Sequence, residues 1–218
     1  MPNPNTVHQA HPVLRGEKYV ITKWFRANGA GPMYTKESNE FIPNYTKKGF
    51  KKSRLEPQLY KKLAHFYQEN QQQSRDEKVD GGFIHSDGPC EVASTVVELP
   101  EELRNEIHSS LQPKLSKWSG VELMPTYVYG IRAYHRGAIL EPHRDRLRTH
   151  IISAIINVDQ KANKRWPLLI QDNFYRFHNV YLEPGEIVYY DGARLTHGRP
   201  EAFDGERFAN IFCHYMPV

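Results

Sequence analysis

Three residues in the second half of the chain have types and spacing that could hold a metal ion. The stretch "LEPHRDRLRTH" places His143 and Asp145 two positions apart. In an extended strand, residues i and i+2 point to the same side, so this imidazole and this carboxylate would converge. His197, in "ARLTHGRP", follows the apolar run "EIVYYD" after a short turn and could supply a third ligand. Two imidazoles and one carboxylate leave adjacent positions open on Fe(II), as an oxygenase requires.

A His-x-Asp pair alone is a weak signal, because the chain contains a second one. His85 and Asp87 stand in "FIHSDGP", whose composition predicts a surface loop without a function. The later pair carries more weight because Arg207 follows His197 by ten residues in the run "RFANIFCHY". We expect its side chain to point inward, where a guanidinium could hold a dicarboxylate through two parallel hydrogen bonds.

The elements that must position these residues are predicted to be strands. From residue 121 onward, short runs rich in β-branched and aromatic residues alternate with turns: "TYVYGIRAY", "THIISAIINV", "WPLLIQD", "NVYLEP", "EIVYYD" and "RFANIFCHY". Upstream, helical spacing begins at Pro57 and again in "PEELRNEIHSSLQPKLSKWSG". Helices followed by about eight short strands predict a mainly β protein with supporting helices and a cupin-like jelly-roll core, a double-stranded β-helix.

The stretches "VYGIRAYHRGAILEPHRD" and "LEPGEIVYYDGARLTHGRPEAFDGERFANIF" resemble the prolyl 4-hydroxylase-like branch of the Fe(II)/2-oxoglutarate-dependent dioxygenases. The resemblance implies that His143, Asp145 and His197 bind the iron. It also implies that Arg207 anchors 2-oxoglutarate and that Tyr134, nine residues before the first iron histidine, faces the 2-oxoglutarate pocket. These residues are therefore the candidate catalytic and cofactor-binding set.

The resemblance also implies a reaction. In this family O2 and 2-oxoglutarate are converted to succinate and CO2 while an unactivated C–H bond is hydroxylated, so Fe(II), 2-oxoglutarate and O2 are the expected cofactors, with ascorbate as an auxiliary. The substrate would be a prolyl peptide, an amino acid or a related small molecule. Leu140 replaces a tyrosine of the collagen-type enzymes, so their substrate cannot be carried over. Arg132 could contact the substrate; the alternative is an arginine paired with an acid at the barrel mouth.

Two other functions stay open. An AlkB-like nucleic-acid demethylase would use the basic run "TKKGFKKSR" at 46–54, but a solvated loop explains this run as well, and that family's second arginine has no evident counterpart. Nucleic acid is therefore not an expected partner. A non-catalytic jelly-roll module would use the triad to hold a structural metal, or no metal at all.

Composition describes a folded protein with one main domain. The chain has 218 residues, 39% of them hydrophobic, and a formal net charge of +4. Its two cysteines, Cys90 and Cys213, are too few for a disulfide framework. No apolar run approaches the roughly 20 residues that cross a bilayer, and the first residues lack a signal-peptide layout. We expect a soluble, cytoplasmic protein without a membrane partner; the oligomeric state is not predicted.

Near its start the chain repeats part of its end. "GEKYVITKW" resembles "GERFANIF", and His8 and Lys18 have the spacing of His197 and Arg207. We interpret the first residues as resembling the C-terminal strands of an upstream prolyl 4-hydroxylase-like domain, with a chance edge strand as the alternative. The predicted organisation is this segment at 1–27, a loop or linker at 28–56, and a dioxygenase domain at 57–218 with helices in 57–120 and the jelly-roll in 121–218.

Overall fold

The computed structural model describes residues 42–77, 79, 81–88 and 91–218. The interpretation of segment 1–27, including His8 and Lys18, falls outside the described residues and stays a prediction. The elements in chain order are β1 (Phe50–Arg54), α1 (Pro57–Asn70), β2 (Arg75–Asp76), β3 (Ile84–Ser86), β4 (Ser94–Val97), α2 (Glu101–Ser119), β5 (Leu123–Tyr134), β6 (Ala138–His143), β7 (Ile152–Ala162), β8 (Leu168–Gln171), β9 (Phe177–Val180), β10 (Glu186–Tyr190), β11 (His197–Arg199) and β12 (Gly205–Pro217).

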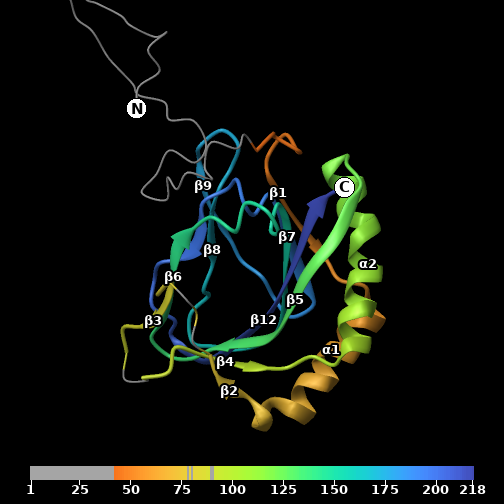
Figure 1. Ribbon diagram of the computed structural model, residues 1–218. Coiled ribbons are helices and arrows are strands. Elements are labelled where there is room, and N and C mark those ends of the chain that lie inside the picture. Colours follow the sequence, from red (N-terminus) through yellow and green to blue (C-terminus); the bar gives the residue numbers. More distant parts are fainter. Residues whose placement is uncertain (1–41, 78, 80, 89–90) are drawn as a thin grey trace, which may run out of the picture.

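Two antiparallel sheets face each other and form the predicted double-stranded β-helix. The larger sheet has the order β1-β10-β7-β12-β5-β4-β2, and the smaller one has the order β3-β6-β11-β8-β9. β12 lies at the centre of the larger sheet, between β7 and β5. The ribbon shows the small sheet on the side of the barrel away from the helices (Figure 1). The mainly β prediction is confirmed.

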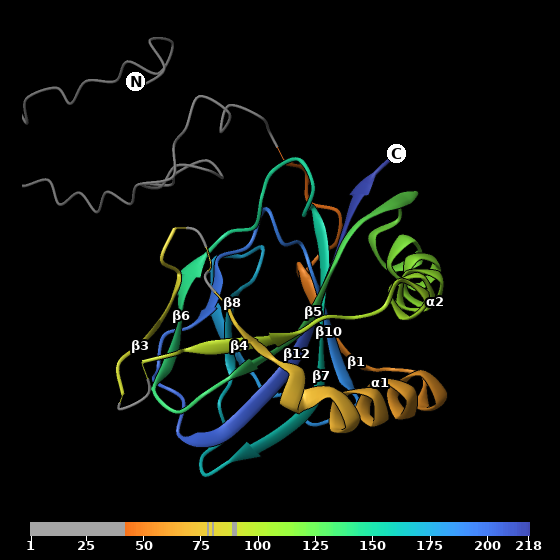
Figure 2. The same cartoon turned by 60° about the horizontal axis from the view of Figure 1, so that its bottom comes forward.

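Both helices cover the outer face of the larger sheet (Figures 1 and 2). Pro at the first helical turn begins α1, and Gly120 ends α2 in the left-handed conformation that glycine adopts without strain. Leu63 and Leu111 are fully buried in a core shared by the helices and this sheet. A second core, which includes Leu168 and Phe208, lies between the two sheets. Side chains on the larger sheet therefore alternate between helix side and barrel interior.

Part of the predicted linker is a strand. Residues 50–54 form β1 and pair with β10 over five positions. Its lysine and arginine side chains lie on the surface, and Lys52 forms an ion pair of 2.5 Å with Glu186. The basic run is thus partly an edge strand and not wholly a solvated loop. Among the described residues, no helix is long and apolar enough to cross a membrane.

Candidate active site

The structure brings His143, Asp145 and His197 together. His143 ends β6 and His197 begins β11, and the two are direct partners across these antiparallel strands. Asp145 follows two residues beyond β6, and its Oδ1 lies 3.7 Å from Nε2 of His143 and 3.6 Å from Nε2 of His197. One ligand atom from each residue lies within 4.8 Å of the others. One cation could therefore contact all three.

Both imidazoles are oriented by the main chain. Nδ1 of His143 donates to the carbonyl of Glu141 at 2.7 Å, and Nδ1 of His197 donates to the carbonyl of Leu195 at 2.9 Å. These hydrogen bonds place the proton on Nδ1 and leave the Nε2 lone pair of each ring directed at Asp145. This is the tautomer that a metal-binding histidine needs, because the second nitrogen must be held by an outer partner.

The charge of the cluster suits a divalent cation. Burial alone would raise the pKa of the Asp145 carboxyl, but in the metal-free protein His197 and His143, in their protonated forms, hold that pKa well below its ordinary value. Burial alone would lower the pKa of His143, and the Asp145 carboxylate more than reverses this. The carboxylate thus attracts positive charge to this point, and a metal ion can supply it without protonating the rings.

The other side of Asp145 is packed closely. Ser153, on β7, donates a hydrogen bond of 3.1 Å to Oδ2 of Asp145 and lies 2.8 Å from Nδ1 of His214. A Cβ atom at Gly192 would lie 2.4 Å from Oδ2 of Asp145, so only glycine fits there. Burial lowers the pKa of His214 to about 3, so its ring is neutral. These neighbours fix the carboxylate in one orientation.

An arginine that we did not predict lies deeper in the barrel. Arg199 follows His197 by two residues on β11, and its side chain is 2% exposed. Its guanidinium lies 4.6 Å from the ring of Trp166 and 4.5 Å from the ring of Phe208, and Nη1 donates to the Trp166 carbonyl. Nη2 is buried and has no hydrogen-bond partner among the described residues. Burial lowers the pKa of Arg199 to about 10, so it stays charged at neutral pH.

A second donor without a partner faces the same interior. Asn210 lies opposite Arg132 across β12 and β5, and is fully buried. Its Oδ1 accepts a hydrogen bond of 3.1 Å from Asn157, but its Nδ2 has no partner within the described part of the chain. Buried donors are nearly always satisfied in folded proteins, so orphaned ones indicate a ligand position. The interior therefore offers donors suited to the oxygens of an anion.

The prediction that Arg207 points inward is wrong. On β12, Phe208 belongs to the core between the sheets, so its neighbour Arg207 projects to the helix side. There its Nε donates to the carboxylate of Asp159, and its side chain is 28% exposed. Burial raises the pKa of Tyr67, on α1, to about 12, and the Arg207 charge works against this rise. Arg207 is a surface ion-pair residue in this structure, separated from the triad by the sheet.

Tyr134 and Arg132 lie on the interior face, as the alternation on β5 predicts. The ring of Tyr134 is fully buried, 5.2 Å from that of Trp166 in an edge-to-face arrangement. Arg132 is paired with Glu77, so the acid-paired alternative for this arginine describes the structure. A binding role for either residue stays a proposal. His85 and Asp87 lie apart from the triad, and His85 pairs with the exposed Glu141.

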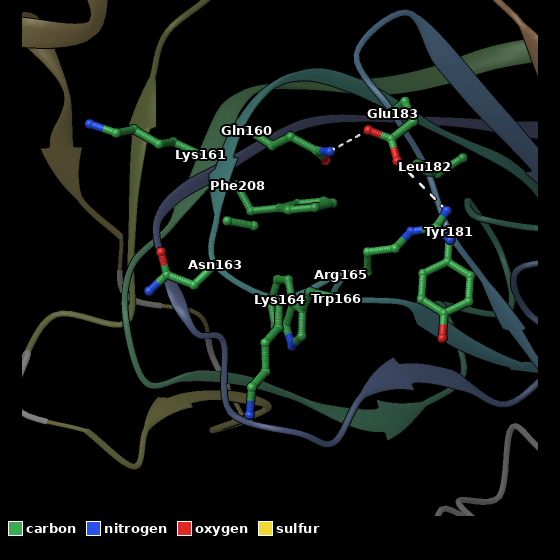
Figure 3. Close-up of a pocket in the computed structure, with 11 residues that line it drawn as sticks. Gln160, Lys161, Asn163, Lys164, Arg165, Trp166, Tyr181, Leu182, Glu183 and Phe208 are labelled. Carbon is green, nitrogen blue, oxygen red and sulfur yellow. Dashed lines mark hydrogen bonds and ion pairs between the residues drawn. The ribbon is translucent and has the colours of Figure 1, made fainter.

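A cavity of about 300 Å³ lies at the other end of β7, away from the triad. Figure 3 shows Gln160 and Arg165 both directed at Glu183 across it. Its wall includes Trp166 and Phe208, the two rings that contact Arg199. None of the triad residues lines it, so it is distinct from the triad end of the barrel.

Together these features define a class. The chain is a double-stranded β-helix with a His-x-Asp and distal His cluster at one end of the barrel and a buried arginine farther inside. Comparison by sequence finds no match among protein families or curated proteins. Comparison by structure finds the same fold in solved structures of a prolyl hydroxylase and of other 2-oxoglutarate-dependent enzymes.

Three solved structures illustrate the likeness. A prolyl-4-hydroxylase of Pseudomonas putida matches with a TM-score of 0.60 and 14% identity, over 79% of this chain and 94% of that one. The alpha-ketoglutarate-dependent epimerase SnoN from nogalamycin biosynthesis matches with a TM-score of 0.62 and 11% identity, over 80% of each chain. EctD from S. alaskensis, with 2-oxoglutarate and 5-hydroxyectoine, matches with a TM-score of 0.56 and 13% identity, over 90% of this chain and 79% of that one. At these identities the likeness establishes the fold.

Proposed function

We propose that the protein is an Fe(II)- and 2-oxoglutarate-dependent oxygenase that hydroxylates an unactivated C–H bond of a peptide, an amino acid or a related small molecule. The observation that carries this proposal is the meeting of three ligand atoms, from His143, Asp145 and His197, within 4.8 Å of one another. Two Nε2 lone pairs and one buried carboxylate repel one another when no cation lies between them. A bound metal ion would remove this unfavourable free energy.

The residues present fit an iron ion and a dicarboxylate. The triad would hold Fe(II), which, with 2-oxoglutarate and O2, supplies the oxidising chemistry. Arg199 would hold the distal carboxylate of 2-oxoglutarate, because its Nη2 has no partner among the described residues and lies in the interior beyond His197. Asn210 Nδ2 is a further candidate donor to the same anion. An anion there would remove the cost of burying these donors unpaired.

The surrounding residues would orient the ligands and exclude water. The rings of Trp166 and Phe208, whose centroids are 5.4 Å apart, both pack against the Arg199 guanidinium, and Tyr134 packs edge-on against Trp166. Burial in this aromatic environment strengthens a charge-assisted hydrogen bond, since water does not compete for the same atoms. A rigid guanidinium at the inner end and a metal at the outer end would fix one orientation of a diacid.

The function is tested by following succinate formed from 2-oxoglutarate in the presence of Fe(II) and O2. We expect turnover by the wild-type protein even without its true substrate, and no detectable turnover by Asp145→Ala, because the carboxylate ligand is lost. Co(II) binding, followed by visible absorption, should weaken in the same variant.

The chain offers a matched control for this test. Asp87→Ala removes the carboxylate of the other His-x-Asp pair, which lies on the surface. It should leave turnover and Co(II) binding unchanged. A wild-type protein that neither forms succinate nor binds 2-oxoglutarate in a metal-dependent way would support the non-catalytic jelly-roll reading instead.

A further inference from the structure

A second buried arginine inside the barrel is already neutralised. Arg132 donates from Nε to Oε2 of Glu77 at 2.5 Å and from Nη2 to Oε1 at 2.7 Å. The two side chains are only 13% and 15% exposed. This two-point pairing is the geometry in which a guanidinium binds a carboxylate most strongly. Of these two arginines, Arg132 has an acid partner, and Arg199 has none within the described part of the chain.

Arg132 is the fixed member of the pair. It lies on β5, which is paired on both sides, with β12 and with β4. Its guanidinium lies 4.8 Å from the ring of Phe212, and Nη1 lies 3.5 Å from the hydroxyl of Tyr134. Phe212 precedes His214 by two residues on β12, and Nδ1 of His214 lies 2.8 Å from the Ser153 hydroxyl that donates to Asp145. A group bound to Arg132 would therefore lie on the same side of the larger sheet as Asp145.

Glu77 lies in the less firmly held element of the pair. It follows β2, a strand of two residues at the edge of the larger sheet, and among the described residues β2 pairs with β4 alone. It is held there by Ser94, whose hydroxyl donates to Oε2 at 3.1 Å and whose carbonyl accepts from the Glu77 amide at 3.1 Å. Short edge strands have few contacts to break, so local opening costs less here than at β5.

We propose that Arg132 binds a carboxylate of the substrate, and that Glu77 occupies this position until the substrate displaces it. That this carboxylate belongs to a substrate rests on the proposed function, whereas the binding of an external carboxylate to Arg132 does not. A carboxylate is the expected group because exchanging one for another keeps Arg132 neutralised. A neutral ligand that displaced Glu77 would leave a largely buried guanidinium without a counter-charge, which is strongly unfavourable. The substrate class is therefore a free acid, such as an amino acid or the end of a peptide.

The first experiment removes the internal carboxylate and supplies it from solution. Glu77→Ala is titrated with sodium acetate, with acetamide and sodium chloride as controls, and the melting temperature is followed on metal-free protein. We expect a lowered melting temperature that acetate, and neither control, restores in a saturable way at millimolar concentration. A folded variant that shows no acetate-specific stabilisation would overturn the proposal.

Two further variants make this result specific. Glu98→Ala removes an exposed carboxylate that pairs with Arg75 and Arg104, so it should show no saturable response to acetate. Adding Arg132→Gln to Glu77→Ala should abolish the response. If Glu77→Ala does not fold, Glu77→Gln keeps the size of the side chain and weakens the pair, and acetate should then stabilise it more than it stabilises the wild type.

The second experiment separates the substrate's carboxylate from that of 2-oxoglutarate. Acetate binding to Glu77→Ala is measured with and without saturating Zn(II) and 2-oxoglutarate. We expect the acetate dissociation constant to change less than threefold, because the co-substrate uses Arg199. Loss of acetate binding in the loaded protein would assign Arg132 to the co-substrate and overturn the proposal. Failure of the proposed function would appear separately, as absent succinate formation with acetate binding intact.

Discussion

At the scale of single residues, burial and pairing separate two arginines that the sequence does not distinguish. Arg199 is 2% exposed and has no carboxylate partner among the described residues, whereas Arg207 is 28% exposed and pairs with Asp159. We predict that Arg199→Gln weakens 2-oxoglutarate binding about 100-fold, because a charge-assisted pair contributes about 2 to 3 kcal/mol. Titration of the Zn(II)-loaded protein with 2-oxoglutarate measures this effect.

Arg207→Gln is the matched control for this prediction. It makes the same chemical change on the other face of the larger sheet, and the dissociation constant for 2-oxoglutarate should stay within about twofold of the wild-type value. A large loss of affinity in the Arg207 variant, with none in the Arg199 variant, would restore the assignment made from the sequence.

Gly192 is a second residue whose role follows from local geometry. An added Cβ would meet Oδ2 of Asp145 at 2.4 Å, Oγ of Ser153 at 2.5 Å and the carbonyl of His150 at 2.8 Å. We predict that Gly192→Ala displaces the carboxylate and weakens Co(II) binding about 10- to 100-fold, the range seen when outer partners of metal ligands are changed. Unchanged Co(II) affinity would show that Asp145 does not need its present orientation.

The meeting of the three candidate metal ligands could be predicted from the sequence, and the direction of Arg207 could not. The prediction that His143 and Asp145 share a side required only the alternation of side chains along an extended chain. Predicting the direction of Arg207 required the register of β12, which shifts against β7 between Gly205 and Arg207. Such a bulge reverses which side chains face inward, and the local sequence does not indicate it. Arg199 could have been found, because it follows His197 at the same two-residue spacing.

At the scale of elements, the β8–β9 hairpin is closed by one buried carboxylate. Asp172 accepts hydrogen bonds from the amides of Phe174 and Arg176 at 2.8 and 3.0 Å, and from Nε2 of His178 at 2.8 Å. Burial alone would raise the pKa of Asp172, but these hydrogen bonds hold it below its ordinary value. We predict that Asp172→Asn lowers the free energy of unfolding by about 2 kcal/mol at pH 7.

The pH dependence of this difference follows from the direction of the shift. A carboxyl whose pKa is lower in the folded state contributes stability above its unfolded pKa, about 3.9, and loses it as pH falls toward the folded value. The gap between wild type and Asp172→Asn should therefore be constant from pH 5 to 7 and shrink below about pH 4. Urea unfolding at several pH values measures it, and a gap that grows in acid would contradict the assignment.

The helices were predictable as elements, and β1 was not. Buried leucines at helical spacing, such as Leu59 and Leu63, identify α1 without any tertiary information. β1 has the sequence FKKSR, in which only Phe50 is buried. Its extended form comes from pairing with β10, and a pairing that distant in sequence leaves no periodic signal in so polar a run.

At the scale of the whole molecule, the fold has two hydrophobic cores, and the candidate site belongs to only one of them. The helices and the outer face of the larger sheet form one core, and the interior between the sheets forms another. Two buried donors without a partner among the described residues, Arg199 Nη2 and Asn210 Nδ2, face the interior between the sheets. The jelly-roll could be predicted from the number and character of the strands, but the order of strands within each sheet depends on long-range pairing that composition does not encode.

The position of β12 has a consequence for how the protein is made. This strand follows every other strand of the barrel in the sequence, yet it lies at the centre of the larger sheet between β5 and β7. A ribosome therefore releases β5 and β7 with open edges that can pair with nothing native until β12 has emerged. Nascent chains at this stage are exposed to misassembly, and chaperone capture during synthesis should matter more for this protein than for one whose central strand is made early.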